Sequence, residues 1–274
     1  MKRINLKISV TLLAIIVTTL YVGTSVASNV GKESTEAASS QEETPGEEVK
    51  TAKLEFKKDK IYEIIYFTFN KNNEKGLYEN YFPKAFPIFE KYGRKFFAWF
   101  NVIEGTSSEN LQASTSIVIV EWPNYAAYEM MNSDEEYKKI ALYRNGGFTF
   151  FQHGWFSTAE DKTVEVREDK AYEFVGATLH QTEEAKTSLD KYFEISEPIK
   201  RSYGGSYPEF ALEMKPVDSK GAATYYSEVQ LIVEWDNETD SHKLFANEEF
   251  LTKAMPLMQK AVRHSDYIYT KYKF

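Results

Sequence analysis

The fold is predicted from an internal repeat, which is clearest in the stretch Val118-Ile119-Val120-Glu121-Trp122. The chain repeats the end of this stretch as Val233-Glu234-Trp235. The residues around the two copies repeat as well: Tyr81-Phe82 ahead of the first copy matches Tyr192-Phe193 ahead of the second. The matched positions lie 110 to 113 residues apart. Solenoid units are about 20–50 residues long, so a repeat of this length predicts a duplicated domain.

Each copy predicts the element order strand, helix, strand, strand, helix, strand. In the first copy, β-rich apolar runs predict strands at 61–69, 96–103, 114–122 and 148–156, and helical spacing predicts helices at 75–92 and 125–142. The second copy predicts strands at 171–180, 206–214, 224–235 and 265–272, and helices at 183–203 and 239–263. Pro83 and Pro87 lie inside the first helical pattern, so we expect a kink or a break there.

This order is that of the ferredoxin-like fold, in which helices cover one face of an antiparallel sheet. The other face is apolar and aromatic here, so something must cover it. We therefore expect an α+β protein of two fused ferredoxin-like βαββαβ repeats, whose antiparallel sheets face each other as a pseudo-dimeric α/β barrel. The interior of such an eight-stranded barrel is filled by side chains or holds one small ligand.

The chain divides into four predicted segments. Residues 1–27 combine a basic start, a short apolar run and small residues, as in a secretory signal peptide. The apolar run is shorter than the ~20 residues that span a bilayer, although an uncleaved anchor is the alternative. Residues 28–57 read as a disordered acidic linker because large apolar residues are scarce there. The first repeat then occupies 58–160 and the second 161–274, with 158–170 a short strand or a loop.

Composition narrows the function classes. The chain has a formal net charge of −8, and loss of the basic leader would make it more acidic. An acidic chain is a poor candidate for nucleic-acid binding, because the phosphate backbone binds to basic patches. The absence of cysteine excludes disulfides, thiol nucleophiles and Cys-type zinc sites. The predicted location is periplasmic or extracellular, without a membrane span in the mature chain.

A family resemblance rests on Tyr92-Gly93, on the run from Val118 to Pro123, and on Ser133-Asp134-Glu135-Glu136-Tyr137. With these residues each half resembles the dimeric α/β-barrel superfamily, most closely its domain-of-unknown-function thirteen-thirty family. The second repeat departs from the pattern where Asp236 replaces the proline. The resemblance implies that one chain fuses both barrel partners. Relatives in the superfamily include monooxygenases of aromatic polyketides, haem-degrading enzymes and haem peroxidases.

Four residues are candidates for chemistry. Strand alternation places Trp122 and Trp235 on the face toward the helices, and Glu121 and Glu234 on the face toward the space between the sheets. A carboxylate there could act as an acid or a base, or it could be a strand-end residue that bonds an Arg, a Tyr or a backbone N–H. His153 and His180 could be general bases or axial haem ligands, or packing and surface residues. No metal-site motif occurs.

The aromatic residues, 15% of the chain, have two interpretations. They fill a wide sheet–sheet interface, or they line a cavity for a planar ligand. The candidate ligand-binding residues are Tyr66, Phe97, Trp99 and Phe150.

The sequence favours an exported small-ligand-binding or structural module with a small aromatic molecule as the candidate ligand. The chain is expected to be a monomer with an intrachain pseudo-dimer, and a higher oligomer is the alternative. The alternative is a cofactor-independent or haem-linked oxidoreductase acting on an aromatic small molecule. No nucleotide or flavin motif occurs, so no cofactor is recognisable, and haem has no motif of its own here. A structural interaction protein is the third possibility.

Overall fold

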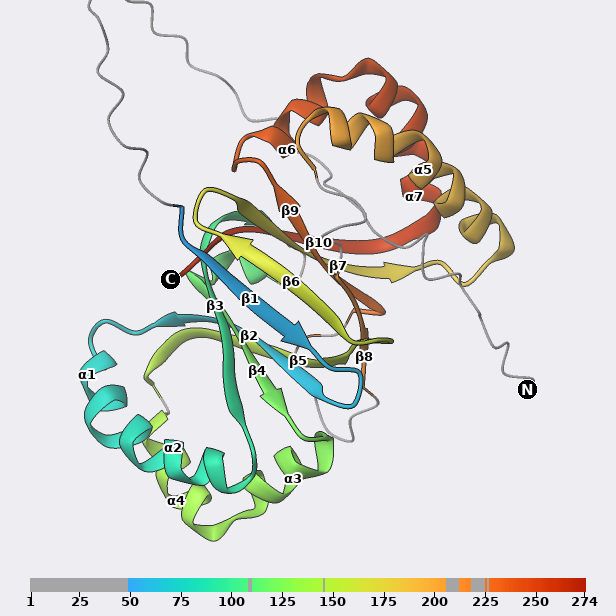
Figure 1. Cartoon of the computed structure of the whole chain (residues 1–274). Coiled ribbons are helices and arrows are strands. Elements are labelled where there is room, and N and C mark those ends of the chain that lie inside the picture. The colour runs from blue at the N-terminus through green and yellow to red at the C-terminus, as the bar shows by residue number, and fades with distance from the viewer. Residues whose placement is uncertain (1–48, 108–109, 145, 206–211, 218–224, 226) are drawn as a thin grey trace, which may run out of the picture.

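Eight antiparallel strands close into a barrel in the computed structural model (Figure 1), which describes residues 49–107, 110–144, 146–205, 212–217, 225 and 227–274. The order around the barrel is β10-β3-β4-β2-β5-β8-β9-β7. The first half contributes β2 (Ile61–Phe69), β3 (Lys95–Thr106), β4 (Ser116–Trp122) and β5 (Phe148–Ser157). The second half contributes β7 (Ala171–Leu179), β8 (Leu212–Pro216), β9 (Val229–Trp235) and β10 (Val262–Tyr272). Within each half the strands follow the ferredoxin-like order, so the predicted fold class is confirmed.

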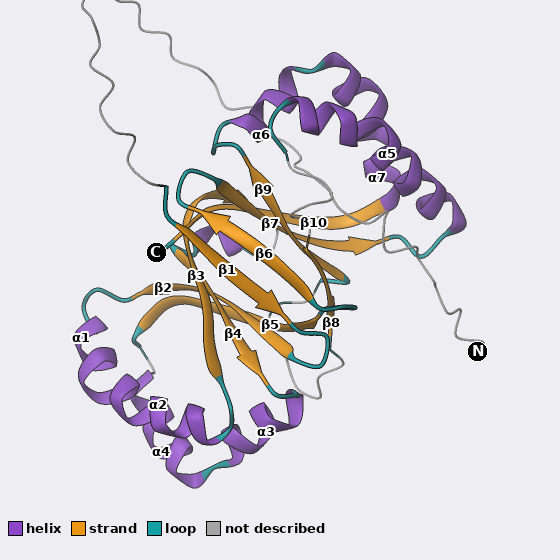
Figure 2. Cartoon of the chain, in the orientation of Figure 1, coloured by secondary structure: helices purple, strands orange, loops and turns teal. Residues whose placement is uncertain are grey.

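The helices form two groups on opposite sides of the barrel (Figure 2). The first half has α1 (Glu74–Gly76), a π-helical turn (Leu77–Tyr81), α2 (Phe82–Lys91), α3 (Tyr125–Ser133) and α4 (Glu135–Arg144), with a 3-10 turn at Leu111–Ala113. The second half has α5 (Glu183–Ser202), α6 (Asp240–Lys243), a 3-10 turn (Leu244–Ala246), a π-helical turn (Phe250–Ala254) and α7 (Met255–Ala261). Among the described residues, no helix is both long enough and apolar enough to cross a membrane.

The helical run 74–91 is continuous: a π-helical turn lies just before Pro83, and α2 continues through Pro87 without a break. The π-helical turn precedes α2, and Pro83 occupies the first turn of α2, where its missing N–H costs nothing. The chain then leaves α2 through Gly93, whose positive φ of 74° forms a left-handed cap. Gly204 has a φ of 84° at the matching place after α5.

A two-stranded ribbon of β1 (Thr51–Phe56) and β6 (Lys162–Arg167) lies across the barrel strands (Figure 1). The linker prediction was therefore too long, because the last residues of 28–57 form a strand. Composition hid this strand, since Leu54 and Phe56 are its only large apolar residues, yet both are buried. Residues 158–170, for which the sequence predicted either a short strand or a loop, contain β6. The predicted signal peptide and residues 28–48 lie outside the described residues.

The ribbon marks the pseudo-twofold axis. Leu54 pairs directly with Val164, and these residues are 110 positions apart, like the other matched positions of the two halves. A strand that pairs with its own counterpart must lie on the axis that relates the halves. Phe56 and Val166 point with them into the barrel, where all four join the same apolar cluster.

Strand alternation determines which side chains fill the barrel. Tyr62, Ile64 and Tyr66 point inward from β2, whereas Ile65 and Phe67 point toward the helices. The inner cluster is rich in rings; its fully buried large members are Phe56, Tyr62, Tyr66, Phe100, Phe156, Tyr172 and Tyr225. Side chains thus occupy the interior, as in other small barrels.

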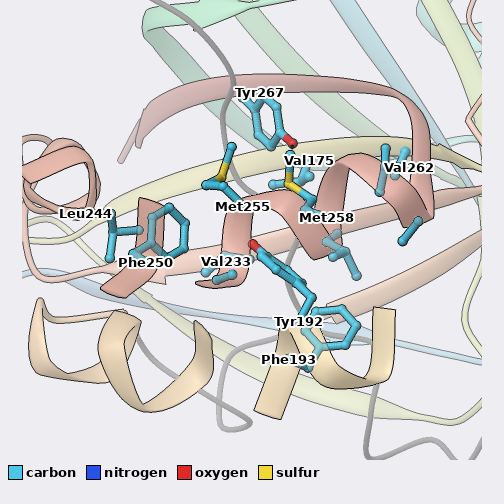
Figure 3. Close-up of a cluster of buried hydrophobic side chains, with 14 of the residues drawn as sticks. Val175, Tyr192, Phe193, Val233, Leu244, Phe250, Met255, Met258, Val262 and Tyr267 are labelled. Atoms are coloured by element: carbon cyan, nitrogen blue, oxygen red, sulfur yellow. Dashed lines mark hydrogen bonds between the residues drawn. The ribbon is translucent and has the colours of Figure 1, made fainter. Parts of the chain in front are cut away.

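Each sheet buries a second apolar cluster against its helices. Trp122 anchors this layer in the first half and Trp235 in the second, and both are almost completely buried. Figure 3 shows the second-half layer, where the Tyr267 hydroxyl points to the sulfur of Met258 at 3.9 Å. The predicted helix-facing side of the two tryptophans is therefore correct.

The ribbon gives the first prediction. Phe56→Ala should lower the free energy of unfolding by about 3 kcal/mol, because it removes a fully buried ring from the barrel interior. Urea denaturation measures this change. Glu55→Ala on the exposed side of the same strand is the control and should change stability by less than about 0.5 kcal/mol. A disordered segment would make both substitutions equally harmless.

Candidate functional site

A carboxylate is buried beneath the helices of the first half. Glu63 on β2 is 4% exposed and faces the helix layer. The indole N–H of Trp122 donates to its Oε2 at 2.9 Å, and Nδ1 of His153 lies 2.6 Å from its Oε1. Nη2 of Arg94 lies 3.8 Å from Oε2. Burial alone would raise the pKa of Glu63, but the His153 hydrogen bond and Arg94 outweigh it, so this pKa lies below its ordinary value.

Aromatic rings surround His153. Phe151 and Trp155 lie on the same face of β5, with ring centroids 5.2 and 4.5 Å from the imidazole. Tyr128 of α3 covers it at 6.4 Å and contacts Trp155 at 4.6 Å. The His153 side chain nevertheless keeps 12% of its surface exposed. We call Glu63, His153, Tyr128, Phe151 and Trp155 the His153 cluster; it joins a buried carboxylate to solvent through one imidazole.

The second half repeats the carboxylate without the histidine. Glu173 lies 110 residues after Glu63, and the indole N–H of Trp235 donates to its Oε2 at 2.9 Å. Val175 pairs with Tyr267 in β10 as Ile65 pairs with His153 in β5, so a tyrosine takes the place of the histidine.

Burial controls the charges in this second-half layer. It raises the pKa of Glu173 to about 7, against hydrogen bonds from Tyr269 and Trp235. Burial also lowers the pKa of Lys200, a fully buried amine on α5 that donates to the Tyr192 hydroxyl at 2.7 Å. The second-half cluster is thus closed to solvent, and burial disfavours the charged forms of both Glu173 and Lys200, whereas in the first half the pKa of Glu63 is lowered.

Sequence reasoning missed Glu63 and Glu173. Each is a lone acid in an apolar strand, and each follows a tyrosine, as Tyr62-Glu63 and Tyr172-Glu173. This repeated Tyr-Glu pair was enough to single out the two carboxylates in the sequence. The repeated tryptophan is explained by it, since Glu63 pairs with Val120, two residues before the Trp122 whose N–H reaches it.

The predicted glutamates lie at the ribbon end of the barrel, on the inward face of their strands. Glu234 accepts a hydrogen bond from the Tyr172 hydroxyl at 3.2 Å, and burial raises its pKa. The backbone N–H of Arg167 donates to that hydroxyl at 2.6 Å. Glu121 lies beside Lys95 at 3.6 Å. Their face was predicted correctly. Glu234 has the tyrosine partner of the structural alternative, whereas Glu121 lies beside a lysine, which that alternative did not include.

The other predicted site residues do not converge. His153 points to the helix layer, away from Glu121 and Glu234, and His180 is exposed at the end of β7. Tyr66, Phe97 and Phe150 belong to the barrel interior, where rings and aliphatic chains surround them. Trp99 faces the helices instead, because the register of β3 shifts between Phe96 and Ala98 and reverses the alternation.

Haem does not fit either histidine. An axial His153 would bind iron through Nε2, and a porphyrin would need a wide opening there, but Phe151, Trp155 and Tyr128 surround the imidazole and leave only 12% of it exposed. His180 is exposed at a strand end, where apolar walls for a porphyrin are lacking among the described residues. Within the same residues, no group of three or more His, Asp or Glu side chains is placed to hold a metal ion.

The family comparison concerns the half that contains the His153 cluster. Residues 60–150 match the model of a domain of unknown function, DUF1330. The chain carries a DUF1330 domain. The family resemblance drawn from Val118 to Pro123 is therefore confirmed for this segment. This DUF1330 domain supplies Glu63, Trp122 and Tyr128 of the site.

Three solved structures illustrate the similarity of the whole chain. An anthrone oxidase-like protein is 12% identical with a TM-score of 0.49, covering 79% of this chain and 92% of that chain. A heme-binding protein from Thermus thermophilus is 7% identical with a TM-score of 0.44, covering 83% and 94%. A mutant chlorite dismutase from Candidatus Nitrospira defluvii is 9% identical with a TM-score of 0.47, covering 80% and 93%. No curated protein sequence matches the chain.

Glu63 of the DUF1330 domain and Glu173 predict opposite pH dependences of stability. Glu173 has a pKa of about 7 in the folded chain and an ordinary value of 4.5. Its contribution is complete below pH 4.5, declines by about 3 kcal/mol up to pH 7 and is constant above. The Glu63 contribution is complete above pH 4.5 and is lost as the pH falls through the lowered pKa of the folded state.

Urea denaturation of the wild type, Glu63→Gln and Glu173→Gln from about pH 3 to pH 8 tests this. Relative to the wild type, Glu173→Gln should gain stability as the pH rises, and Glu63→Gln should gain stability as the pH falls. The exposed Glu55→Gln serves as the control. If both buried-site variants followed the same trend, the assigned charges would be wrong.

Proposed function

We propose that the protein binds a small aromatic molecule at the His153 cluster, and that His153, backed by Glu63, accepts a proton from it. The observation that carries this proposal is the 2.6 Å contact between an ionised, buried Glu63 and an imidazole that reaches solvent. A carboxylate at Nδ1 fixes the orientation of the imidazole and stabilises the imidazolium that forms when a proton is taken.

The surroundings of the imidazole support an aromatic ligand. Phe151 and Tyr128 are half-buried beside His153, and their rings offer apolar faces next to the base. Planar ligands gain from stacked or edge-to-face contacts with such rings. The filled barrel interior makes the helix layer the better place for this ligand than the space between the sheets.

The contrast between the halves supports the same residues. Both halves keep the Glu–Trp hydrogen bond, which serves folding. Of these two carboxylates, Glu63 has the lowered pKa and the histidine partner, so the features beyond folding are concentrated in the first half. Export of the chain, inferred from residues 1–27, would place this binding outside the cytoplasm.

Cofactor-independent oxidation is a second candidate, favoured by the same base. Removal of the proton of a bound phenol leaves an electron-rich phenolate, which dioxygen can oxidise without a metal or flavin. This reaction needs no haem, in agreement with the packed surroundings of His153. Dioxygen consumption by the purified protein with an added phenol would test it, and Glu63→Gln should reduce the rate.

Methyl p-hydroxycinnamate is a suitable probe of binding, because its phenolate absorbs at longer wavelength than its phenol. Bound to the wild type, the probe should show the phenolate band at a pH where the free probe is protonated. His153→Ala should abolish this band, and the O-methylated probe should bind without it. His180→Ala, the exposed histidine, is the matched control and should behave as the wild type.

Two results would contradict the proposal. One is the absence of binding by both probes, which would show that the His153 cluster does not bind such an aromatic molecule. The other is a phenolate band that persists in His153→Ala, which would assign the proton acceptor to another residue.

A further inference from the structure

Arg144 presents an unmatched positive charge beside the His153 cluster. It lies in the last turn of α4, and its guanidinium is 5.3 Å from the centroid of the Phe151 ring. Its side chain is partly buried and feels the negative charge of Glu63 only at a distance. Among the described residues, no carboxylate pairs with it and no acceptor hydrogen-bonds to it.

Such a guanidinium is costly without an anion. A desolvated charge is normally paired, and Arg in particular provides a planar fork that fits a carboxylate. Two other arginines of the chain pair with acids: Arg167 with Asp169 at 2.8 Å and Arg201 with Glu197 at 2.8 Å. Arg144 is more enclosed than a typical surface arginine, and no acid in the described residues pairs with it.

A second donor in the same layer is also unmatched. Nε1 of Trp155 is buried and bonds to no acceptor in the described part of the chain, and Trp155 is only 3% exposed. Its ring contacts both His153 and Tyr128. Buried donors in native proteins nearly always have a partner, so an acceptor from outside the chain is expected here.

The charged side chains around the His153 cluster also favour an anionic ligand. Arg94 and Arg144 carry two positive charges, and Glu63 carries one negative charge. In the described part of the second half, Gly205 follows the helix-capping glycine where Arg94 follows Gly93, so no arginine takes the place of Arg94 there. The Arg94 charge is therefore specific to the half that holds His153.

We propose that the ligand of the His153 cluster is an aromatic acid, whose carboxylate binds Arg144 while its ring lies against Phe151 and His153. The Phe151 ring contacts both groups, with its centroid 5.3 Å from the Arg144 guanidinium and 5.2 Å from the imidazole, so a planar molecule at this ring is within reach of both. This inference rests on the proposed function and adds the charge of the ligand. Arg144 acts as the specificity residue, and His153 remains the proton acceptor.

The test compares p-hydroxycinnamate with p-hydroxycinnamamide, which has the same shape without the charge. Isothermal titration of the full chain should show that the acid binds the wild type about tenfold or more tightly than the amide. Arg144→Met should remove this preference and leave the affinity for the amide unchanged. Arg144→Lys keeps the charge without the fork and should retain part of the preference.

Lys84→Met is the matched control. Lys84 lies on the exposed side of the same helical layer, with its ammonium 4.7 Å from the Tyr143 ring, and its loss should leave the preference intact. Because the acid–amide ratio is measured within one protein, a small change in stability of a variant does not affect it. Circular dichroism confirms that each variant is folded.

Each failure has its own signature. Equal binding of acid and amide by the wild type, or a preference that persists in Arg144→Met, would overturn the assignment of Arg144 and leave the proposed function intact. Absence of binding by the acid, the amide and the methyl ester alike would instead overturn the proposed function itself.

Discussion

The rest of the structure depends on one hydrogen bond that occurs twice, from a tryptophan indole to a carboxylate buried between sheet and helices. A buried acid without a donor would cost several kcal/mol. In each half the tryptophan two residues beyond the cross-strand neighbour supplies that donor, at 2.9 Å. This requirement fixes the register of β2 against β4 and of β7 against β9, and with it the side of each strand that fills the barrel.

The same hydrogen bond has opposite electrostatic surroundings in the two halves. Arg94 and His153 keep Glu63 ionised, whereas burial without a close cation raises the pKa of Glu173 to about 7. Both arrangements fold because each satisfies the carboxylate in a different protonation state. The fold requires the Glu–Trp hydrogen bond but does not fix the protonation state of the carboxylate. The two halves can therefore differ in chemistry although they share one architecture.

Strand order, barrel closure and the face of Trp122 were predictable, because they follow from period-two alternation and from a repeated motif. Three features were not. A register shift within β3 turns Trp99 to the helices, and composition gives no sign of a bulge. The β1 strand is stable only because β6, more than 100 residues away, pairs with it. The Glu63–His153 contact joins residues 90 positions apart, so no local motif could announce it.

Fusing two barrel halves into one chain changes what each half can tolerate. In a dimer of identical chains every residue occurs twice, so an unmatched charge such as Arg144 would destabilise both halves. In this chain Arg144 and His153 occur once, and in the corresponding layer of the second half burial disfavours the charged forms of Glu173 and Lys200. The two halves can then differ in charge, and only one of them places Arg144 and the Nε1 donor of Trp155 near His153. Pseudo-symmetry thus explains the fold, and the departures from it indicate where a ligand binds.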